Sequence, residues 1–319
     1  MKKFNMQNVF VWVIPKRTGG YKWRYTGNHE RIFNYLKLQI HNSIDLGWPI
    51  ESIIPITNFP FEHMGVKAYE LDGDLYNWSA FSNRMVSVNE MIEKKVINDN
   101  FWVHDLDAYQ LVPFDFPESC KGVSFTRHAP RRIKPQGASV FYRKDTHDLV
   151  KAMAESIPIF RVKKEESFFP KFFCKSNEKD IAKLESILRG QKLKLEDLSK
   201  SSLKPDLLKS NIEKIEKEIS SIELKIDIAK KYFSKFSDKF SWLNWEYNLC
   251  HQRMFDQKYP KATKPIKVVH CKMESESVVN CFYNGKNSLK LPIITDRLEE
   301  LLFKYDLIDP RNKRKISCP

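Results

Sequence analysis

Continuous apolar runs alternate with segments of helical periodicity from residue 9 to about residue 155. Residues 9–14 and 53–56 are apolar runs typical of buried strands, and residues 28–46 carry apolar side chains three or four positions apart, as in a helix with one buried face. This alternation favours an α/β domain with a mainly parallel sheet and flanking helices. The same reasoning predicts helices over residues 84–95 and 146–155 and strands over residues 122–126, 138–142 and up to Asp105.

A second pattern begins near residue 177. Apolar residues follow a heptad spacing from residue 212 to residue 240, and residues 181–198 keep a similar spacing. Because residues 199–205 interrupt the pattern and end in a proline, we expect two long helices that form an antiparallel hairpin inserted into the α/β domain. Residues 177–240 hold 15 basic and 12 acidic side chains, which is typical of a solvated helical surface. Pairing of the two helices within one chain is the first expectation, and dimerisation or contact with an acceptor are the alternatives.

The chain after the hairpin is rich in aromatic residues. Residues 241–259 indicate a buried helix that contains several Trp and Tyr side chains. Residues 265–269 predict a short strand that ends at His270, and residues 298–305 predict a late helix.

Two aspartates, Asp105 and Asp107, follow an apolar run with one residue between them. Alternate residues of a strand point the same way, so two carboxylates would meet at the end of a buried strand, where each is costly to desolvate and repels the other. A divalent cation removes both costs, and carboxylate oxygens suit Mg²⁺ or Mn²⁺. The alternative is a turn with two solvated aspartates. Residues 72–74 have the same Asp-x-Asp spacing, but their central glycine favours a hairpin turn.

Two further residues are candidates for chemistry. His270 closes a short predicted strand, where an imidazole is an acceptable ligand for Mn²⁺, although a single histidine is more often structural. Glu246 lies among Trp242, Trp245 and Tyr247; if it is buried, its pKa is raised and it can act as a general base towards a hydroxyl. The alternative is a glutamate on the exposed side of an aromatic helix.

The formal charge of +14 and the pI near 9.3 indicate an anionic partner such as nucleic acid or a nucleotide. Basic residues interleave with aromatic ones after the first strand, and a second basic group follows residue 126. Phosphates need cations and bases need flat stacking partners, so both groups are candidate contacts, although solvated loop charge is the alternative. The candidates for acceptor or nucleic-acid contact are Lys22, Arg24, Arg127, Arg131 and Arg132.

Several classes of protein are excluded by absent motifs. The chain has no Walker A or GxGxxG motif, so P-loop and dinucleotide-binding functions are not expected. Its six cysteines form no CxxC pair, which argues against structural zinc. No apolar run approaches the length of a membrane span or a signal-peptide core, so we expect a cytoplasmic protein, in the host cytoplasm if the source is viral.

The chain resembles the GT-A glycosyltransferases in several motifs. Residues 101–107 resemble the DxD motif of that family, and residues 82–86 fit the nucleotide-contacting segment that precedes it. Residues 136–143 resemble the small-residue strand that lines the donor-sugar pocket, and His270 lies where many members place a third metal ligand. The resemblance covers roughly residues 9–160 and 240–272. The basic, Lys/Asn-rich composition is similar to phage and viral members, including those that glycosylate modified DNA bases.

The resemblance implies a role for each candidate residue. Asp107 would be a direct ligand of Mn²⁺ or Mg²⁺, with Asp105 contacting ribose or reaching the metal through water, and His270 the third ligand. The implied donor or nucleotide contacts are Lys16, Arg17, Arg84, Gln136 and Gly137.

The resemblance also implies three parts of the chain. These are a nucleotide-sugar-binding core (residues 1–176), the hairpin insertion (177–240) and the rest of the catalytic core with a basic tail (241–319).

The leading hypothesis is therefore a metal-dependent glycosyltransferase that moves a sugar from a nucleotide sugar, first of all a UDP-sugar, to a hydroxyl. The acceptor is a modified base in DNA or, as the alternative, a glycan or protein. Glu246 would be the base in an inverting reaction. The competing hypothesis is a non-enzymatic, basic nucleic-acid-binding protein with a coiled-coil arm.

Overall fold

The computed structural model of the chain describes residues 4–13, 29–72, 75, 80–129, 132–160, 177–200, 205–250, 265–270 and 295–307. The helices are α1 (His29–Asp45), α2 (Ala80–Glu93), α3 (His147–Phe160), α5 (Asn177–Ser199), α6 (Pro205–Phe236) and α8 (Asp296–Lys304). The strands are β1 (Gln7–Trp12), β2 (Ile53–Thr57), β3 (Glu62–His63), β4 (Val66–Lys67), β5 (Tyr69–Glu70), β6 (Phe101–His104), β7 (Ala108–Gln110), β8 (Val123–Ala129), β9 (Arg132–Tyr142), β10 (Phe240–Leu243), β11 (Leu249–Cys250) and β12 (Val268–His270).

The central sheet has seven strands in the order β10-β8-β9-β6-β1-β2-β5. The pairs β6–β1, β1–β2, β2–β5 and β10–β8 are parallel, whereas β9 is antiparallel to both β6 and β8. Since β1, β2 and β6 run in the same direction, their carboxyl ends meet at one edge of the sheet. The prediction of an α/β fold with a mainly parallel sheet and flanking helices is confirmed.

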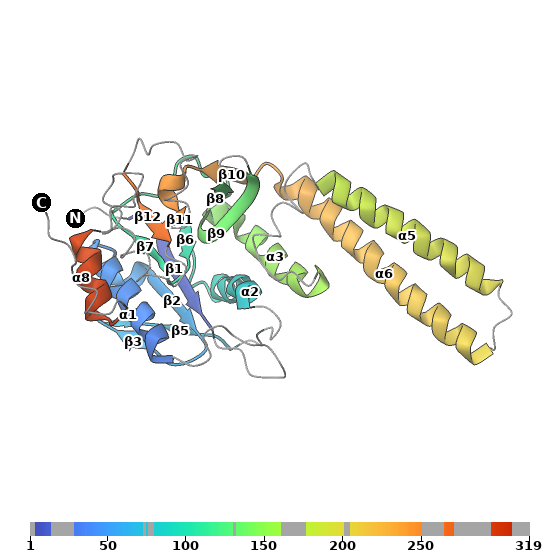
Figure 1. Cartoon of the computed structure of the whole chain (residues 1–319), viewed down its shortest axis with the longest axis horizontal. Coiled ribbons are helices and arrows are strands. Elements are labelled where there is room, and N and C mark those ends of the chain that lie inside the picture. Colours follow the sequence, from blue (N-terminus) through green and yellow to red (C-terminus); the bar gives the residue numbers. More distant parts are fainter. Residues whose placement is uncertain are drawn as a thin grey trace, which may run out of the picture.

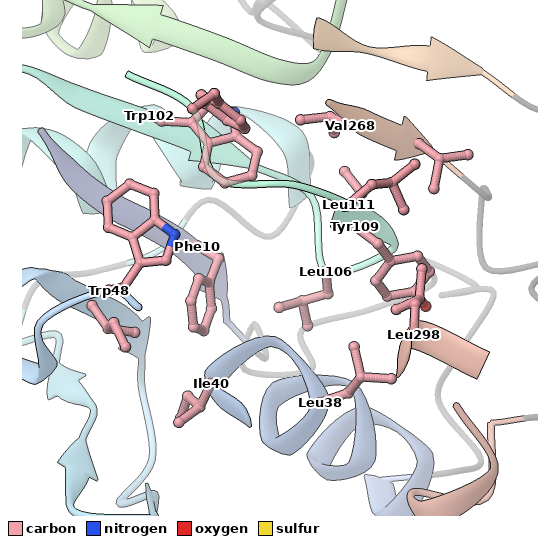
Figure 2. Packing of buried hydrophobic residues seen from close by; sticks show 14 of the residues in the cluster. Phe10, Leu38, Ile40, Trp48, Trp102, Leu106, Tyr109, Leu111, Val268 and Leu298 are labelled. Carbon is pink, nitrogen blue, oxygen red and sulfur yellow. The ribbon is translucent and has the colours of Figure 1, made fainter. Parts of the chain in front are cut away.

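Each face of the sheet packs against its own hydrophobic cluster, because successive strand residues point to opposite faces. Val9 and Val103 pack with α2, α3 and the end of α6, while Phe10 and Trp102 pack with α1, α8 and β12. Figure 2 shows the second cluster, where side chains from the sheet meet α1 and α8. Burying an aliphatic or aromatic side chain of this kind contributes about 1.5–3 kcal/mol, so the layers on the two faces both stabilise the sheet between them.

A second, three-stranded sheet with the order β11-β12-β7 lies beside the first. β7 follows the aspartate pair directly and pairs antiparallel with β12, so that Ala108 is opposite His270. The sequence predicted β12, as a short strand that ends at His270, but not β7 or β11, which are only three and two residues long.

The prediction of a helix over residues 241–259 is wrong for the described residues. Residues 240–250 form β10, the 3-10 turn Trp245–Tyr247 and β11, and residues 251–259 lie outside the described ranges. Phe240, Trp242 and Leu243 pair with β8 as an edge strand. Aromatic residues fit a pleated, half-buried surface as well as a helix, and here pairing with β8 decides between the two.

Helices α5 and α6 form the expected antiparallel pair, which Figure 1 shows extending away from the sheet. Their bounds agree with the break predicted over residues 199–205. The prediction that the heptad helix continues to residue 240 is wrong, because α6 ends at Phe236 and Phe240 belongs to β10. At the base of the hairpin, Ala229 and Phe236 are buried in the α2–α3 cluster and Lys235 pairs with Asp148 (2.6 Å).

The hairpin rejoins the sheet beside Gly122. The carbonyl of Lys239 accepts the backbone N–H of Val123 (2.8 Å), and a Cβ on Gly122 would lie 2.6 Å from that carbonyl oxygen. Only glycine allows this close approach. The division of the chain into parts 1–176, 177–240 and 241–319 stays a prediction.

Candidate metal-binding site at the sheet edge

The aspartate pair lies in a tight turn directly after β6. The backbone N–H of Asp105 donates to the carbonyl of Ala138 on β9 (2.9 Å), and the N–H of Ala108 donates back to the carbonyl of Asp105 (3.0 Å). The sequence predicted a strand up to Asp105 and strand alternation for the pair, but β6 ends at His104, so neither aspartate lies on the strand. The turn, rather than strand periodicity, brings the two carboxylates to the same side.

His270 meets both aspartates at this edge. Its Nε2 lies 3.4 Å from Oδ1 of Asp107 and 4.0 Å from Oδ2 of Asp105, and one potential ligand atom from each of the three residues lies within 4.8 Å of the others. Asp107 is 4% exposed and His270 is 7% exposed, whereas Asp105 is half-buried. The three residues predicted as metal ligands are therefore brought together.

This donor set fits a divalent cation. Ligand atoms about 2.1 Å from an octahedral cation are roughly 3 Å apart when adjacent and roughly 4.2 Å apart when opposite. The distances from Nε2 of His270 to the two aspartates, 3.4 and 4.0 Å, lie between these values. Two carboxylates compensate the cation charge, and a cation relieves their repulsion in a largely buried site. An imidazole donor is acceptable to Mn²⁺ and less usual for Mg²⁺.

Arg84 on α2 holds the first aspartate. One Nη of its guanidinium donates to Oδ1 of Asp105, and the other donates to the carbonyl of Gly137 on β9 (2.5 Å). Arg84 was predicted to contact a nucleotide or phosphate. These two contacts place Arg84 against Asp105, so Arg84 orients this aspartate and balances part of the negative charge of the turn.

Asp105, Asp107 and His270 form the candidate metal-ligand group, and Gln136 on β9 contacts its histidine. Its amide Nε2 donates to Nδ1 of His270 (3.3 Å), and its side chain is 5% exposed. Gln136 and Gly137 were predicted as donor contacts, and β9 carries both to the metal-ligand group.

His104 supports the turn from beneath. Its ring stacks on Trp102 with centroids 4.1 Å apart, its Nε2 lies 2.8 Å from Oδ1 of Asn8, and its Nδ1 lies 3.0 Å from the carbonyl of Asp105. Burial lowers the pKa of His104 to about 4, although the Asp105 carbonyl acts in the opposite direction. A neutral, buried imidazole therefore packs directly below the aspartate pair at neutral pH.

Glu246 is buried on the 3-10 turn rather than on a helix. Its Oε1 lies 3.4 Å from Nζ of Lys267, which also donates to the hydroxyl of Tyr247 (2.7 Å). Lys267 precedes His270 by three residues, which is about 10 Å along an extended chain. Glu246 thus lies near the start of β12, whereas the metal-ligand group lies at its end.

Two buried polar side chains near the group were missed by the sequence analysis. Thr126 on β8 is opposite Gln136 in the sheet, and its Oγ1 has no hydrogen-bond partner among the described residues. Asn248 lies two residues before Cys250, which pairs with His270 in the three-stranded sheet. Asn248 is only 2% exposed, and neither of its side-chain amide atoms has a hydrogen-bond partner among the described residues. No sequence signal separates such residues from ordinary loop polar residues.

The basic candidates lie mostly outside the description. Lys16, Arg17, Lys22, Arg24 and Arg131 are outside the described residues, as are the glycine and second aspartate of the Asp-Gly-Asp sequence at residues 72–74. Arg127 and Arg132 lie on β8 and β9, but their side chains are not described.

Among the helices of the described ranges, none combines the length and the apolar character that crossing a membrane requires.

Comparison with known proteins gives matches among solved structures alone. No protein-family model matches the sequence, and no curated protein matches it. One similar structure is described as a glycosyltransferase involved in glycosylation of the major capsid of PBCV-1 (TM-score 0.44, 9% identity, 86% of this chain and 98% of that chain). LgtC is similar with a TM-score of 0.45 and 10% identity over 94% of this chain and 96% of that one. The glycosyltransferase GlyE of Streptococcus pneumoniae TIGR4 is similar with a TM-score of 0.43 and 11% identity; the match covers 96% of this chain but 61% of the GlyE chain.

Proposed function

We propose that this chain is a metal-dependent glycosyltransferase that moves a sugar from a nucleotide-sugar donor to a hydroxyl acceptor. The observation that carries the proposal is the convergence of Asp105, Asp107 and His270 within 4.8 Å at the carboxyl edge of a mainly parallel sheet. Ligands of α/β proteins bind at this edge. A metal-ligand group placed there is suited to a substrate that carries a diphosphate.

Asp107 and His270 would hold the cation directly, with Asp105 as the third, more exposed ligand. Mn²⁺ or Mg²⁺ bound there supplies positive charge for the diphosphate of the leaving nucleotide. Arg84 keeps the carboxylate of Asp105 turned towards the group. Lys16 and Arg17 are proposed as further contacts to the nucleotide.

Donor recognition is assigned to the residues of β9 and its surroundings. Gln136 and Gly137 border the metal-ligand group, and Thr126 and Asn248 offer buried polar atoms that have no described protein partner. Sugar hydroxyls are both donors and acceptors, so they match such atoms. A buried, unpaired polar atom costs about 1–3 kcal/mol, which a bound hydroxyl would recover.

Glu246 is proposed as the general base if the reaction inverts the anomeric centre. A deprotonated carboxylate can accept the proton of an acceptor hydroxyl, and Lys267 holds Glu246 in place. If the reaction retains the configuration, Glu246 positions the acceptor instead.

The acceptor is proposed to be a modified base in DNA, with a glycan or protein as the alternative. The formal charge of +14 exceeds what a donor diphosphate requires. The proposed contacts to a nucleic acid are Lys22, Arg24, Arg127, Arg131 and Arg132. Transfer to duplex DNA should fall steeply as salt rises, because each phosphate contact releases counterions; transfer to a neutral glycan should not.

Thermal unfolding tests the proposal directly. A panel of nucleotide sugars is added to the wild-type chain and to Asp107→Asn, with and without Mn²⁺. The expected result is a rise in Tm that requires both Mn²⁺ and one nucleotide sugar in the wild type and is lost in Asp107→Asn, since a ligand that binds only the folded state stabilises it. An equal response of both proteins would contradict the proposal. For a non-enzymatic nucleic-acid-binding protein, changing Asp105 and Asp107 to Asn would instead leave the activity intact and affect at most the stability, and no metal-dependent transfer would be lost.

A further inference from the structure

β9 sets the position of the first aspartate through its backbone. The carbonyl of Ala138 accepts the backbone N–H of Asp105 (2.9 Å), and the carbonyl of Gly137 accepts a hydrogen bond from Arg84 (2.5 Å), which also holds the carboxylate of Asp105. β9 is itself held between β6 and β8. Asp105 is therefore held by β9 as well as by its own turn.

Gln136, the residue before Gly137 on β9, contacts His270 through its side chain. The amide contacts Nδ1 of the ring (3.3 Å), and the opposite ring nitrogen, Nε2, faces Asp107 (3.4 Å) and Asp105 (4.0 Å). Both Gln136 and His270 are more than nine-tenths buried, so water competes little for either ring nitrogen.

The two ring nitrogens cannot play the same role. A neutral imidazole carries one N–H and one lone pair, and a metal ligand needs the lone pair on the nitrogen that faces the metal. If Nε2 supplies the lone pair, the proton lies on Nδ1, and the group next to Nδ1 must accept it. If Nε2 carries the proton, it donates to the aspartates, and the group next to Nδ1 must donate.

We propose that Gln136 is the positioning residue for His270. This rests on the proposed function, in which the metal-ligand group holds a divalent cation. A glutamine amide has a donor at one end and an acceptor at the other, so a half-turn of the amide matches either tautomer of the ring. When Nδ1 of His270 has the lone pair, Nε2 of Gln136 donates to it, which is the contact that this structure shows. With a cation, Oε1 of Gln136 accepts the Nδ1 proton and leaves the lone pair of Nε2 to the metal.

Titration calorimetry of the full-length chain with Mn²⁺ alone, without nucleotide, tests the proposal. Gln136→Met keeps the volume and removes the hydrogen bond, and we expect Mn²⁺ to bind about 10–100-fold more weakly, the usual effect of losing such an outer partner. Gln136→Glu can still accept the Nδ1 proton, and we expect it to bind Mn²⁺ at least as tightly as the wild type. If Gln136→Met does not fold, Gln136→Asn, whose amide is one methylene too short, takes its place.

Gln110→Met is the matched control. Gln110 is a buried glutamine on β7 that accepts from Trp48 (2.7 Å) and donates to the carbonyl of Val112 (2.9 Å). We expect its loss to lower the Tm and to leave Mn²⁺ affinity unchanged. The role of Gln136 would be overturned if Gln136→Met bound Mn²⁺ as tightly as the wild type. It would also be overturned if Gln136→Glu or Gln110→Met lost as much Mn²⁺ affinity as Gln136→Met. Neither result would affect the metal site itself. A wild type that binds Mn²⁺ no more tightly than Asp107→Asn would overturn the metal site itself, and with it the proposed function.

Discussion

The metal-ligand group and the helical hairpin differ in how far apart along the chain their contacting residues lie. Gln136 and His270 are 134 positions apart, whereas the cross-helix contacts Gln191–Glu218 and Glu185–Lys230 join residues 27 and 45 positions apart. A hairpin forms wherever two matching apolar faces follow one another, and its pattern is visible in a short window. A site assembled from distant segments exists only when the whole sheet is in place.

The two regions also differ in solvent exposure. Asp107 and His270 are almost fully buried, while Lys192 and Glu223, which pair across the hairpin at 2.8 Å, are 53% and 45% exposed. Charges interact strongly where water is excluded and weakly where it is not. The comparison therefore predicts that substitutions at the sheet edge and at the buried base of the hairpin have large effects on activity or stability. Substitutions along the hairpin surface should have small effects.

The largest effect is expected for Asp107→Asn. Under the proposed function, removing this buried carboxylate should lower metal-stimulated transfer by about 10³-fold, which corresponds to about 4 kcal/mol of transition-state stabilisation. The measurement is kcat/KM with Mn²⁺ in excess. Asp72→Asn is the control, because Asp72 belongs to the other Asp-x-Asp sequence and its side chain is 83% exposed. Equal losses in both variants would show that burial at the sheet edge is not what matters.

The base of the hairpin should behave like the core. Phe236 is 3% exposed and packs in the α2–α3 cluster, so Phe236→Ala should lower the free energy of unfolding by about 3–4 kcal/mol. Leu193→Ala removes a side chain on α5 that is 60% exposed and should change it by less than about 0.5 kcal/mol. Urea unfolding measures both. A small loss in Phe236→Ala would mean that the hairpin contributes little to the core.

The histidine under the aspartate turn should make the sheet edge sensitive to acid. The pKa of His104 is about 4 in the folded chain and about 6.5 when unfolded, so the unfolded chain binds the extra proton between these values. Its contribution to stability is fully present above pH 6.5 and declines as the pH falls towards 4, by up to about 3 kcal/mol. Urea unfolding at pH 7, 6 and 5 in EDTA, compared with His104→Gln, isolates this residue from the other histidines. Parallel pH profiles of the two proteins would refute the expectation.

The smallest effect is expected on the hairpin surface. Lys192→Ala removes the ion pair with Glu223, and exposed pairs contribute less than about 1 kcal/mol. The free energy of unfolding should therefore change little, and the change should vanish at high salt. A loss comparable with that of Phe236→Ala would mean that the hairpin depends on charge rather than on apolar packing.

Much of the fold was predictable because it rests on periodicity. The strands of residues 9–14 and 53–56 and the break between α5 and α6 agree with the structure to within two or three residues. The error over residues 241–259 has a physical cause: Trp and Tyr suit a helix or an edge strand, and the free edge of β8 decided the outcome. Of the three-stranded sheet, only the strand ending at His270 was predicted, because strands of two or three residues carry no period.

The sequence by itself determined the alternation of strands and helices, the hairpin, and the residue types of a candidate metal site, because these depend on local spacing. Only the tertiary structure decided that Asp105 and Asp107 meet His270 through a turn. The same holds for the position of Arg84 behind Asp105, for the contact between Gln136 and His270, and for the place of Glu246 at the far end of β12. Each of these contacts depends on the register of strands that are distant in sequence, and burial of two apolar faces fixes that register across the sheet.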